Sequence, residues 1–589
     1  MSRVVGRPAP SQSVDFVVHL PLRNLAQLEQ LTTLQGDRNS PLYHHFLTPA
    51  QFRASFGPTA QTMGKATEAL RLRGLAVTKS ETQLLHVRGS SAKVEAAFNT
   101  QLGIVRDSRG RTSVAAPRTL TVPSELSAIG ATVAGLSLRP RPQPLSKLVP
   151  LNRKSDHGGY WFSDLKQAYQ YPAYATGDGK GVTIATVGES DYSDADAALY
   201  FNHEKLGGTG ALAPAPTLQH LVFPGGAPFD PTTGVSDEAD LDVQQSGGSA
   251  PGATIIGIDI PPGPGETFLL AYSYIDEANN IDIVSTSYGE CEFYYNIEYP
   301  FNNGVDQKGI LQAYHQIFLQ GNSQGITFVF SSGDNGSTDC APPGYFGPPT
   351  GAKFATLPGP GIWVDDPNTT GVGGTNLITT YAPPSLKSTY VKEYAYSDVV
   401  TQPFDLDGTG NLLTNVHWAS GGGVSTIFAK PAFQNLVQTG ANMRAVPDVS
   451  MHMGGCPFYT DSTGKPVPVN CGKLPRSYDY AYIGGALAGL IGTSASAPEF
   501  AGLLAVKESI QKSRLGNENV DIYELAKNNN AFPFKFFHQG IPGDDGVVYV
   551  PAGRTGYNTV LGVGTPYGLN FTFTPYSAPA GDPQTATNP

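Results

Sequence analysis

The chain contains few cysteines, few charged residues and no long apolar run. Cysteine accounts for 4 of its 589 residues, which excludes a small scaffold held together by disulfides. No stretch approaches the roughly 18 consecutive apolar residues that a membrane-spanning helix needs, so we expect no membrane partner. Charged residues make up 15% of the chain, and the net charge of −11 argues against nucleic acid as a partner.

The first residues, MSRVVGRPAPSQSVDF, lack the apolar segment of a signal peptide. We nevertheless expect a secreted protein, because the cysteines are placed to form two disulfides, Cys291–Cys340 and Cys456–Cys471, and disulfides persist in oxidising compartments. The signal would then be absent from this sequence, or export would use another route. No cysteine pair has the spacing of a zinc or redox motif.

What the chain does contain is enough apolar sequence for a large core, since 40% of its residues are hydrophobic. Its length predicts two or three domains. Residues 1–155 carry an excess of Lys and Arg, whereas the remainder carries an excess of Asp and Glu. This split predicts a cationic front that docks on an anionic body, unless the two surfaces are unrelated. We expect four segments: a small domain over 1–135, a basic Pro-rich linker over 136–158, a main domain over 159–576 and a flexible tail over 577–589.

The first segment shows the pattern of a small α+β domain. Alternating apolar residues predict strands over 14–20, 75–79, 83–88 and 101–105, and helical periodicity predicts helices over 25–34, 61–72 and 92–98. This order is compatible with a split βαβ sheet. The linker has no periodicity and several prolines, so we expect it to be exposed and open to cleavage.

The main domain alternates short apolar strands with helices. Strands are predicted over 181–187, 253–258, 282–286 and 326–330, and helices over 193–202, 237–245, 268–278 and 309–321. Continuous apolar strands between helices predict an α/β fold with a mostly parallel sheet covered by helices on both faces. In such sheets the functional residues gather beyond the carboxyl ends of the strands.

A serine in a glycine-initiated loop gives the strongest chemical signal. Ser494 lies in Gly-Thr-Ser-Ala-Ser-Ala-Pro, directly before an apolar helical run. A helix N-terminus stabilises negative charge, which suits a nucleophile that attacks a carbonyl group. The alternative is that Ser494 only caps the helix. No histidine lies in a recognisable catalytic loop, so the base for such a serine would have to be a carboxylate.

Two further motifs supply carboxylates. Glu238 and Asp242 are one helical turn apart on the same face, where a buried pair would share a proton; an exposed acidic helix is the alternative. Asp334, in Ser-Ser-Gly-Asp-Asn-Gly, follows an apolar strand. A protonated aspartic acid there could donate a hydrogen bond to an oxyanion, although an Asx turn would use the same residues.

In this order the motifs resemble the sedolisin family of serine-carboxyl peptidases, including its kumamolisin-like pro-enzymes. Other stretches agree with the family: residues 250–253, 371–375, 420–425 and 447–449. Residues 163–172 look like the start of the family's mature domain, and residues 14–105 look like its activation propeptide. The resemblance covers nearly the whole chain. It implies a subtilisin-like α/β fold preceded by a ferredoxin-like propeptide.

The resemblance also implies roles for the candidate residues. Ser494 would be the nucleophile and Glu238 its general base and acid. Asp242 would orient Glu238, and protonated Asp334 would stabilise the oxyanion. The activity implied is that of a self-processing endopeptidase zymogen. Reference pKa values of the carboxyl groups, shifted by about one unit, predict an activity optimum between roughly pH 2.5 and 5. We expect a monomer that acts on proteins or peptides and is inhibited by its own propeptide. The alternatives are a tripeptidyl-peptidase, a Ser-His-Asp hydrolase and a non-catalytic relative.

Three positions near the expected site and two near the C-terminus depart from the family's pattern. Ile491 stands where serine is usual, Tyr288 where some relatives carry tryptophan, and Gly188 where kumamolisin-type enzymes have an additional glutamate. We therefore expect a shorter carboxylate network. Family members usually bind calcium, but Gln539 and Asn558 replace two of the ligand carboxylates, and neutral amides hold a hard cation weakly. We expect no required cofactor and absent or weak calcium binding.

Overall fold

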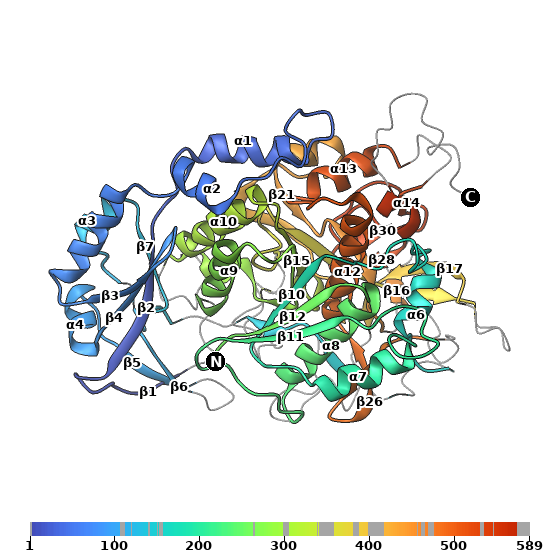
Figure 1. Cartoon of the computed structure of the whole chain (residues 1–589), viewed down its shortest axis with the longest axis horizontal. Coiled ribbons are helices and arrows are strands. Elements are labelled where there is room, and N and C mark those ends of the chain that lie inside the picture. Colours follow the sequence, from blue (N-terminus) through green and yellow to red (C-terminus); the bar gives the residue numbers. More distant parts are fainter. Residues whose placement is uncertain are drawn as a thin grey trace.

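The computed structural model describes residues 3–106, 112–118, 120–138, 142–149, 151, 157–262, 266–297, 306–338, 340, 359–380, 388–398, 418–455, 458–460, 466–468, 476–529, 535–545 and 547–573. We refer to residues 3–138 as the N-terminal unit, to 142–149 as the connecting segment and to 157–573 as the C-terminal unit (Figure 1). The boundaries expected at 135, 158 and 576 remain predictions, and the expected tail lies outside the described residues.

The N-terminal unit contains a four-stranded antiparallel sheet. Its order is β3 (Ala76–Ser80), β4 (Leu84–Ser90), β2 (Ser13–His19) and β7 (Thr132–Ala134). On one face, Phe16 and Val87 pack with apolar residues of α3 (Ala60–Arg71) and α4 (Ser91–Ala97). Read across the sheet from β7, the order is β7, β2, β4 and β3. If the four strands are numbered 1 to 4 along the chain, this order is 4-1-3-2, the ferredoxin-like arrangement that we expected.

One predicted strand belongs to another sheet. The strand predicted over 101–105 is present as β5 (Gly103–Arg106), but it pairs with β1 (Arg3–Gly6) and β6 (Thr112–Ala115). The position at the sheet edge is taken by β7, which we did not predict. Alternation of apolar residues indicates a strand, but it does not say which strand becomes its neighbour.

The C-terminal unit is built on an eight-stranded sheet. Its order is β11 (Thr217–Val222), β12 (Thr254–Asp259), β10 (Thr183–Gly188), β13 (Ile283–Thr286), β15 (Thr327–Ser331), β16 (Thr370–Thr379) and β17 (Tyr390–Ala395), with β22 (Val449–His452) also paired to β16. All pairs are parallel except β16 with β17. The four predicted strands and the mostly parallel sheet are confirmed.

Helices cover both faces of this sheet (Figure 1). Along β10, Ile184 packs with α8 (Gly234–Ser249) and α12 (Thr493–Gln511), whereas Ala185 packs on the opposite face with α9 (Glu266–Ala278) and α10 (Lys308–Ser323). Successive side chains of a strand point to opposite faces of the sheet. The continuous apolar strands therefore contribute side chains to two hydrophobic cores, one on each face. The predicted helices over 237–245, 268–278 and 309–321 are confirmed, as is the helix over 193–202, which is α7 (Asp194–His203).

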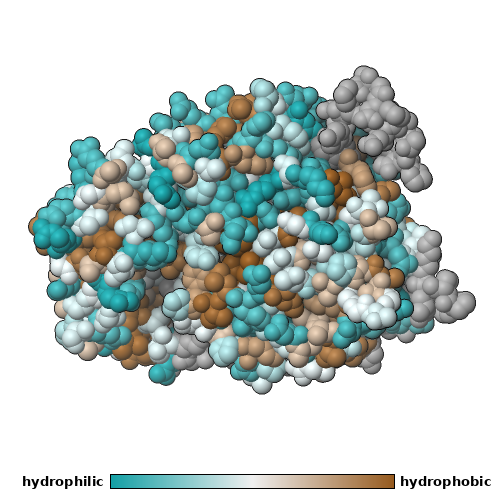
Figure 2. Space-filling model, viewed as in Figure 1, coloured by the Kyte–Doolittle hydropathy of each residue, from teal (hydrophilic) through white to brown (hydrophobic). Residues whose placement is uncertain are grey.

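The N-terminal unit docks on α9 and α10 and reaches over the C-terminal unit with α1 (Leu25–Gly36). Ion pairs of the expected polarity join the two units: Arg53 pairs with Glu277 at 3.2 Å, and Arg38 pairs with Asp521. Gln83 donates a 2.8 Å hydrogen bond to Gln320. In the space-filling view hydrophobic residues gather where the two units meet (Figure 2).

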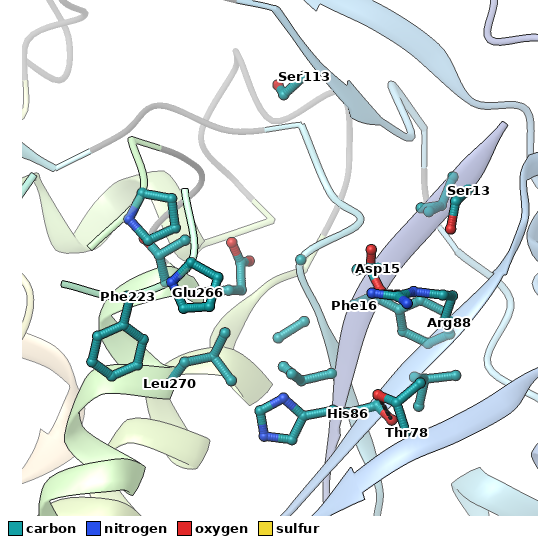
Figure 3. Close-up of a pocket in the computed structure, with 18 of the residues that line it drawn as sticks. Ser13, Asp15, Phe16, Thr78, His86, Arg88, Ser113, Phe223, Glu266 and Leu270 are labelled. Carbon is teal, nitrogen blue, oxygen red and sulfur yellow. Dashed lines mark hydrogen bonds and ion pairs between the residues drawn. The ribbon is translucent and has the colours of Figure 1, made fainter. Parts of the chain in front are cut away.

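The docking leaves a cavity of about 950 Å³ between the sheet of the N-terminal unit and α9. Phe16 and His86 line it from the sheet, and Phe223, Glu266 and Leu270 line it from the C-terminal unit (Figure 3). None of the candidate catalytic residues lines this cavity. It is therefore a feature of the docking interface and not of the candidate site.

The connecting segment is held by backbone pairing, although Gln143 and Leu148 are exposed as we expected. Its residues form β8 (Gln143–Pro144), which pairs with β14 (Tyr288–Gly289), and β9 (Lys147–Val149), which pairs with β26 (Ala486–Ile491). The composition of the segment did not indicate these pairings, and the expected cleavage stays a prediction. Backbone hydrogen bonds to two existing strand edges can hold a chain that has no periodicity of its own.

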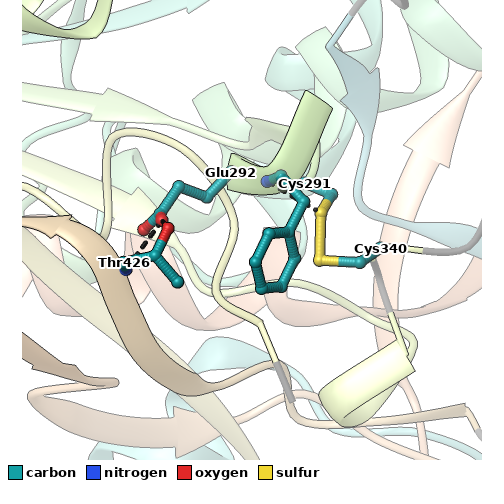
Figure 4. The surroundings of a disulfide bond; sticks show 5 residues. Cys291, Glu292, Cys340 and Thr426 are labelled. Carbon is teal, nitrogen blue, oxygen red and sulfur yellow. Dashed lines mark hydrogen bonds between the residues drawn. A yellow bond between two sulfur atoms is a disulfide. The ribbon is translucent and has the colours of Figure 1, made fainter. Parts of the chain in front are cut away.

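The predicted disulfide Cys291–Cys340 is confirmed, and both of its cysteines are buried (Figure 4). It joins the residues just after β14 to the segment after β15. The Glu292 carboxylate beside it accepts a 2.8 Å hydrogen bond from the backbone N–H of Thr426. The other predicted pair, Cys456–Cys471, lies outside the described residues. No helix in the described part of the chain has the length and apolar character needed to cross a membrane.

Candidate active site

The turn before α12 places Ser494 at the centre of the molecule. Gly492 precedes the helix with φ of 140°, a conformation that favours glycine. Ser494 is fully buried, and its hydroxyl donates a 3.3 Å hydrogen bond to the Ser287 carbonyl. Its backbone N–H donates a 3.1 Å hydrogen bond to the carbonyl of Leu145 in the connecting segment. Ser494 therefore does more than cap the helix.

Glu238 and Asp242 project from α8 toward Ser494. Both are buried, at 0% and 2% exposure, which excludes the alternative of an exposed acidic helix. Glu238 Oε2 accepts a 2.6 Å hydrogen bond from the hydroxyl of Ser146, the residue after Leu145, whose carbonyl accepts the N–H of Ser494. Burial and the neighbouring Asp242 carboxyl raise the pKa of Glu238 well above its usual range, although the nearby Ser146 and Ser494 hydroxyls oppose the rise.

Asp242 is held by a hydroxyl that the sequence analysis did not single out. The Ser287 hydroxyl donates a 2.6 Å hydrogen bond to Asp242 Oδ1. Burial raises the pKa of Asp242 well above its usual range, and this hydrogen bond works against the rise. Ser287 comes directly after β13. A polar residue at the carboxyl end of a central parallel strand was the signal that could have identified it.

Asp334 lies three residues after β15 and faces the same turn. Its Oδ1 accepts hydrogen bonds from the backbone N–H of Thr493 at 2.6 Å and from the Thr493 hydroxyl at 2.9 Å. A Cβ added to Gly492 would overlap the Leu145 carbonyl oxygen and would lie 2.7 Å from Asp334 Oδ2. The absence of a side chain at Gly492 thus leaves room for a carboxyl group and a carbonyl group to approach each other.

The structure brings all four candidate residues into one site beyond the carboxyl ends of β13 and β15. Within the described part of the chain, the hydrogen-bond partners of Ser494 include no histidine. His452 is a core residue, whose ring packs on Tyr160 and accepts the N–H of Leu377, and His315 pairs with Asp366. Around Ser494 the described residues instead bring together the carboxyl groups of Glu238, Asp242 and Asp334.

The three departures near the site have simple structural consequences. The Tyr288 ring fills the space beside Gly188, since its Cε2 would lie 3.3 Å from a Cβ added there. Tyr288 thus stands where a longer side chain at position 188 would have to pass. Ile491 packs with Val149 and Tyr478. It thus belongs to the part of β26 that pairs with β9 of the connecting segment.

The residues at the position of the family's calcium site are already paired with protein groups. Gln539 Nε2 donates to the Val563 carbonyl at 2.9 Å, and its Oε1 accepts the N–H of Gly556 at 3.3 Å. Asn558 Oδ1 accepts the N–H groups of Val560 and Leu561 at 3.1 and 2.9 Å. Amide N–H groups repel a cation and occupy the oxygens that it would need, so this donor set does not fit calcium.

Asp545, which stands near those positions, is also occupied. It accepts hydrogen bonds from the Ser337 hydroxyl at 2.6 Å and from the N–H of Val547 at 2.9 Å. Among the residues that the structure describes, no group of three or more His, Cys, Asp or Glu side chains is arranged to hold a metal ion.

Comparisons with known proteins connect this geometry to two family models. The model described as "Pro-kumamolisin, activation domain" matches residues 1–139, and the "Subtilase family" model matches residues 232–540, more than half of the chain. Sedolisin of Pseudomonas sp. (strain 101) is 28% identical over 565 residues, covering 93% of this chain and 83% of that protein. Kumamolisin of Bacillus sp. (strain MN-32) is 25% identical over 463 residues, covering 76% and 71%.

A solved structure supports the fold. Pseudomonas sedolisin (serine-carboxyl proteinase), complexed with two molecules of pseudo-iodotyrostatin, aligns with a TM-score of 0.53 at 22% identity. The alignment covers 70% of this chain and 97% of that one. The shared architecture is the subtilisin-like α/β fold with a mostly parallel central sheet.

Proposed function

Because this chain belongs to the subtilase family, and within it to the sedolisins, we propose that it is an acid-active endopeptidase made as a self-processing zymogen. It is a serine-type peptidase, and its N-terminal unit is a propeptide of the activation-domain type. The observation that carries the proposal is the buried carboxyl pair of Glu238 and Asp242 beside Ser494, where Ser287 bonds both to the Ser494 hydroxyl and to the Asp242 carboxyl group.

The proposed reaction forms an acyl-enzyme on Ser494. Glu238 removes the hydroxyl proton as the oxygen attacks the substrate carbonyl, and it then returns the proton to the leaving amine. Asp242, held by Ser287, is buried next to Glu238, and the closeness of the two carboxyl groups raises the affinity of Glu238 for the proton. The backbone N–H of Ser494 and protonated Asp334 stabilise the oxyanion.

Acid is a chemical requirement of this arrangement. The two hydrogen bonds from Thr493 go to Oδ1 of Asp334, whereas Oδ2 lies on the side of the carbonyl oxygen beside Gly492, to which the protonated acid would donate. An aspartic acid donates only while it is protonated, whereas Glu238 must lose its proton to act as a base. Both conditions hold together at acidic pH if the burial of the carboxyls separates their pKa values.

An endopeptidase is favoured over a tripeptidyl-peptidase by the path of the connecting segment. Its backbone pairs with β14 before Leu145 and with β26 after Ser146, and a polypeptide bound in this way on both sides of Ser494 supports the proposal. We further propose that the enzyme acts as a monomer, is secreted and requires no metal. The buried disulfide Cys291–Cys340 supports an oxidising compartment.

The test is incubation of the purified full chain at pH 4 beside its Ser494→Ala variant. We expect self-cleavage and hydrolysis of an added unfolded protein only with the wild type. Ser509→Ala is the matched control, because Ser509 lies on the same helix but its hydroxyl bonds to Val506 and the N–H of Gly179, away from the site. Equal activity of wild type and Ser494→Ala, or maximal activity at neutral pH, would contradict the proposal.

A further inference from the structure

The connecting segment lies across the active site in the position of a substrate. From its contacts we infer that the peptide bond between Leu145 and Ser146 is the bond that the protein cleaves in itself, and that its neighbours show which side chains the site prefers. The inference rests on the proposed function, and it adds the bond and the substrate class.

The Leu145 carbonyl is the group that Ser494 would attack. Its oxygen accepts the backbone N–H of Ser494 at 3.1 Å and lies beside the Gly492 Cα, on the side of Asp334 Oδ2. A carbonyl held by an N–H group at a helix start, next to a carboxylic acid, is polarised for attack. The Leu145 N–H donates a 3.1 Å hydrogen bond to the Ser287 carbonyl, which fixes the peptide on its other side.

Glu238 lies on the side of the leaving amine. Its Oε2 accepts a 2.6 Å hydrogen bond from the hydroxyl of Ser146, the residue whose nitrogen would leave. Ser494 Oγ would bond to the Leu145 carbonyl carbon while its proton passes to Glu238. The bond from that carbon to the Ser146 nitrogen then breaks, and the nitrogen takes the proton from Glu238. Water hydrolyses the Leu145 ester, which releases a carboxyl group and restores Ser494.

The strand pairings on the two sides select this bond among those of the segment. Gln143 and Pro144 are paired with Gly289 and Tyr288, and Lys147 is paired with Ile491. Between these ladders only Leu145 and Ser146 are left to span the distance from one strand edge to the other. Their shared peptide group is the one that faces Ser494.

The side chains of the segment indicate what the site binds. The Leu145 side chain packs over Gly289, where an added Cβ would lie 3.1 Å from Leu145 Cδ1, so the residue before the bond has little spare space on that side. The Lys147 ammonium group lies 2.8 Å from the centre of the Trp418 ring, a cation–π contact. The geometry therefore points to substrates with a branched apolar residue before the bond and a cation at the second position after it.

The first test is the N-terminus of the earliest product. The full chain is incubated at pH 4 and sampled by mass spectrometry before later trimming. We expect a product beginning at Ser146 and a complementary fragment ending at Leu145. The Leu145→Lys variant should yield this product at a rate lower by on the order of tenfold or more, because a longer and charged side chain must replace the leucine that packs on Gly289.

Leu148→Lys is the matched control. Leu148 is also a leucine of the connecting segment, but its side chain is 47% exposed, so the same substitution there should leave the rate unchanged. A peptide with the sequence of residues 141–150, RPQPLSKLVP, covers the case in which Leu145→Lys does not fold. Wild-type protein activated at pH 4 should cut it between Leu and Ser, and should cut a variant peptide with Ala in place of the lysine less efficiently.

The outcomes separate the inference from the proposed function. If the wild type hydrolyses an unrelated protein at pH 4 but its first product and its cut in the peptide lie elsewhere, the inference is wrong and the proposed function stands. If Ser494→Ala is as active as the wild type, both are wrong. A first cut at Ser146 that Leu148→Lys slows as strongly as Leu145→Lys would refute the assignment of the apolar subsite.

Discussion

The hydroxyl of Ser287 donates a 2.6 Å hydrogen bond to the carboxyl group of Asp242, and the carbonyl of the same residue accepts the hydroxyl of Ser494. One residue at the end of β13 thus contacts both the nucleophile and the carboxyl pair. Ser287 is a positioning residue: it acts on the reaction through Asp242.

Removing this hydroxyl should shift the pH dependence of the reaction. In Ser287→Ala the ionised form of Asp242 loses a hydrogen bond, so the pKa of Asp242 rises further. The acid limb of the profile of kcat against pH should move to higher pH by about one to two pH units. A shift of this size corresponds to the free energy of one hydrogen bond to a charged group. Ser287→Thr, which keeps the hydroxyl, should restore the profile. Ser285→Ala, a buried serine of the same strand, is the control. An unchanged profile in Ser287→Ala would contradict the role.

Asp334 should prove necessary as a hydrogen-bond donor. Asp334→Ala removes the donor beside Gly492, and kcat should fall by about 10²–10³-fold with a smaller change in KM. Asp334→Asn keeps a donor that does not titrate, so its residual activity should extend to higher pH than that of the wild type. Both variants are measured with one peptide substrate between pH 3 and 7. An Asn variant whose activity still falls at the same pH as the wild type would show that another group sets that limit.

The folded protein should be more stable in acid than at neutral pH. Burial, helped by the nearby carboxyl of Asp196, raises the pKa of Asp240 to about 8, and burial raises that of Asp259 to about 7. The folded state binds these protons more tightly than the unfolded chain does. The stabilisation is therefore complete below the unfolded pKa of about 3.9 and is lost as the pH rises toward 7 and 8.

Thermal unfolding of the inactive Ser494→Ala protein measures this effect without self-digestion. Its Tm should be lower at pH 8 than at pH 5, and Asp240→Asn should recover at least about 2–4 °C at pH 8 while changing little at pH 5. A Tm that rises between pH 5 and 8 would count against these carboxyls as determinants of stability.

Acid should also loosen the N-terminal unit. His19 is buried beside Gln83 at the docking interface, and burial lowers its pKa to about 4. The docked state thus excludes a proton that the free unit accepts. Docking is fully favoured above the unfolded pKa of about 6.5 and weakens as the pH falls toward 4.

Hydrogen exchange of Ser494→Ala, corrected for the intrinsic pH dependence, tests this. Protection of β2 and α1 should drop between pH 6.5 and 4, and it should drop less in His19→Gln, which keeps a polar side chain that does not titrate. The same change in His86→Gln, a half-buried histidine of the neighbouring strand β4, should have a smaller effect. Protection of β2 that is equal at the two pH values would argue against the histidine.

Chelation of calcium should leave the protein unaffected. The amides of Gln539 and Asn558 make the hydrogen bonds that close the C-terminal loops, so no bound ion is needed there. The Tm in the presence of EDTA should agree within about 1 °C with the Tm in excess calcium, because a ligand that binds the folded state would raise it. A clear fall on chelation, or a rise with added calcium, would overturn the assignment.

The sequence predicts the elements of this fold better than their partners. Apolar runs located β10, β12, β13 and β15 to within two residues, because buried parallel strands leave a strong local signal. The candidate residues Ser494, Glu238 and Asp334 could be found because each stands in a distinctive motif.

Contacts between residues far apart in the chain could not be predicted from the sequence. The place of Ser287 after a central strand marks it only as one of several polar residues at that edge of the sheet, and it does not indicate that the hydroxyl of Ser287 holds Asp242. The path of Leu145 and Ser146 through the site depends on hydrogen bonds of the main chain, which every residue except proline can make. Composition therefore identified a basic, proline-rich linker but gave no information on where its backbone is bound.

The pairing of the connecting segment on both sides of Ser494 has a consequence for activation. If the chain is severed between the two ladders, β8 and β9 each keep their neighbours, and the severed ends face each other at a high effective concentration. The nicked molecule would then stay latent, as a complex held without a covalent link. Departure of the old N-terminal portion, and not scission itself, would be the event that opens the enzyme to other proteins.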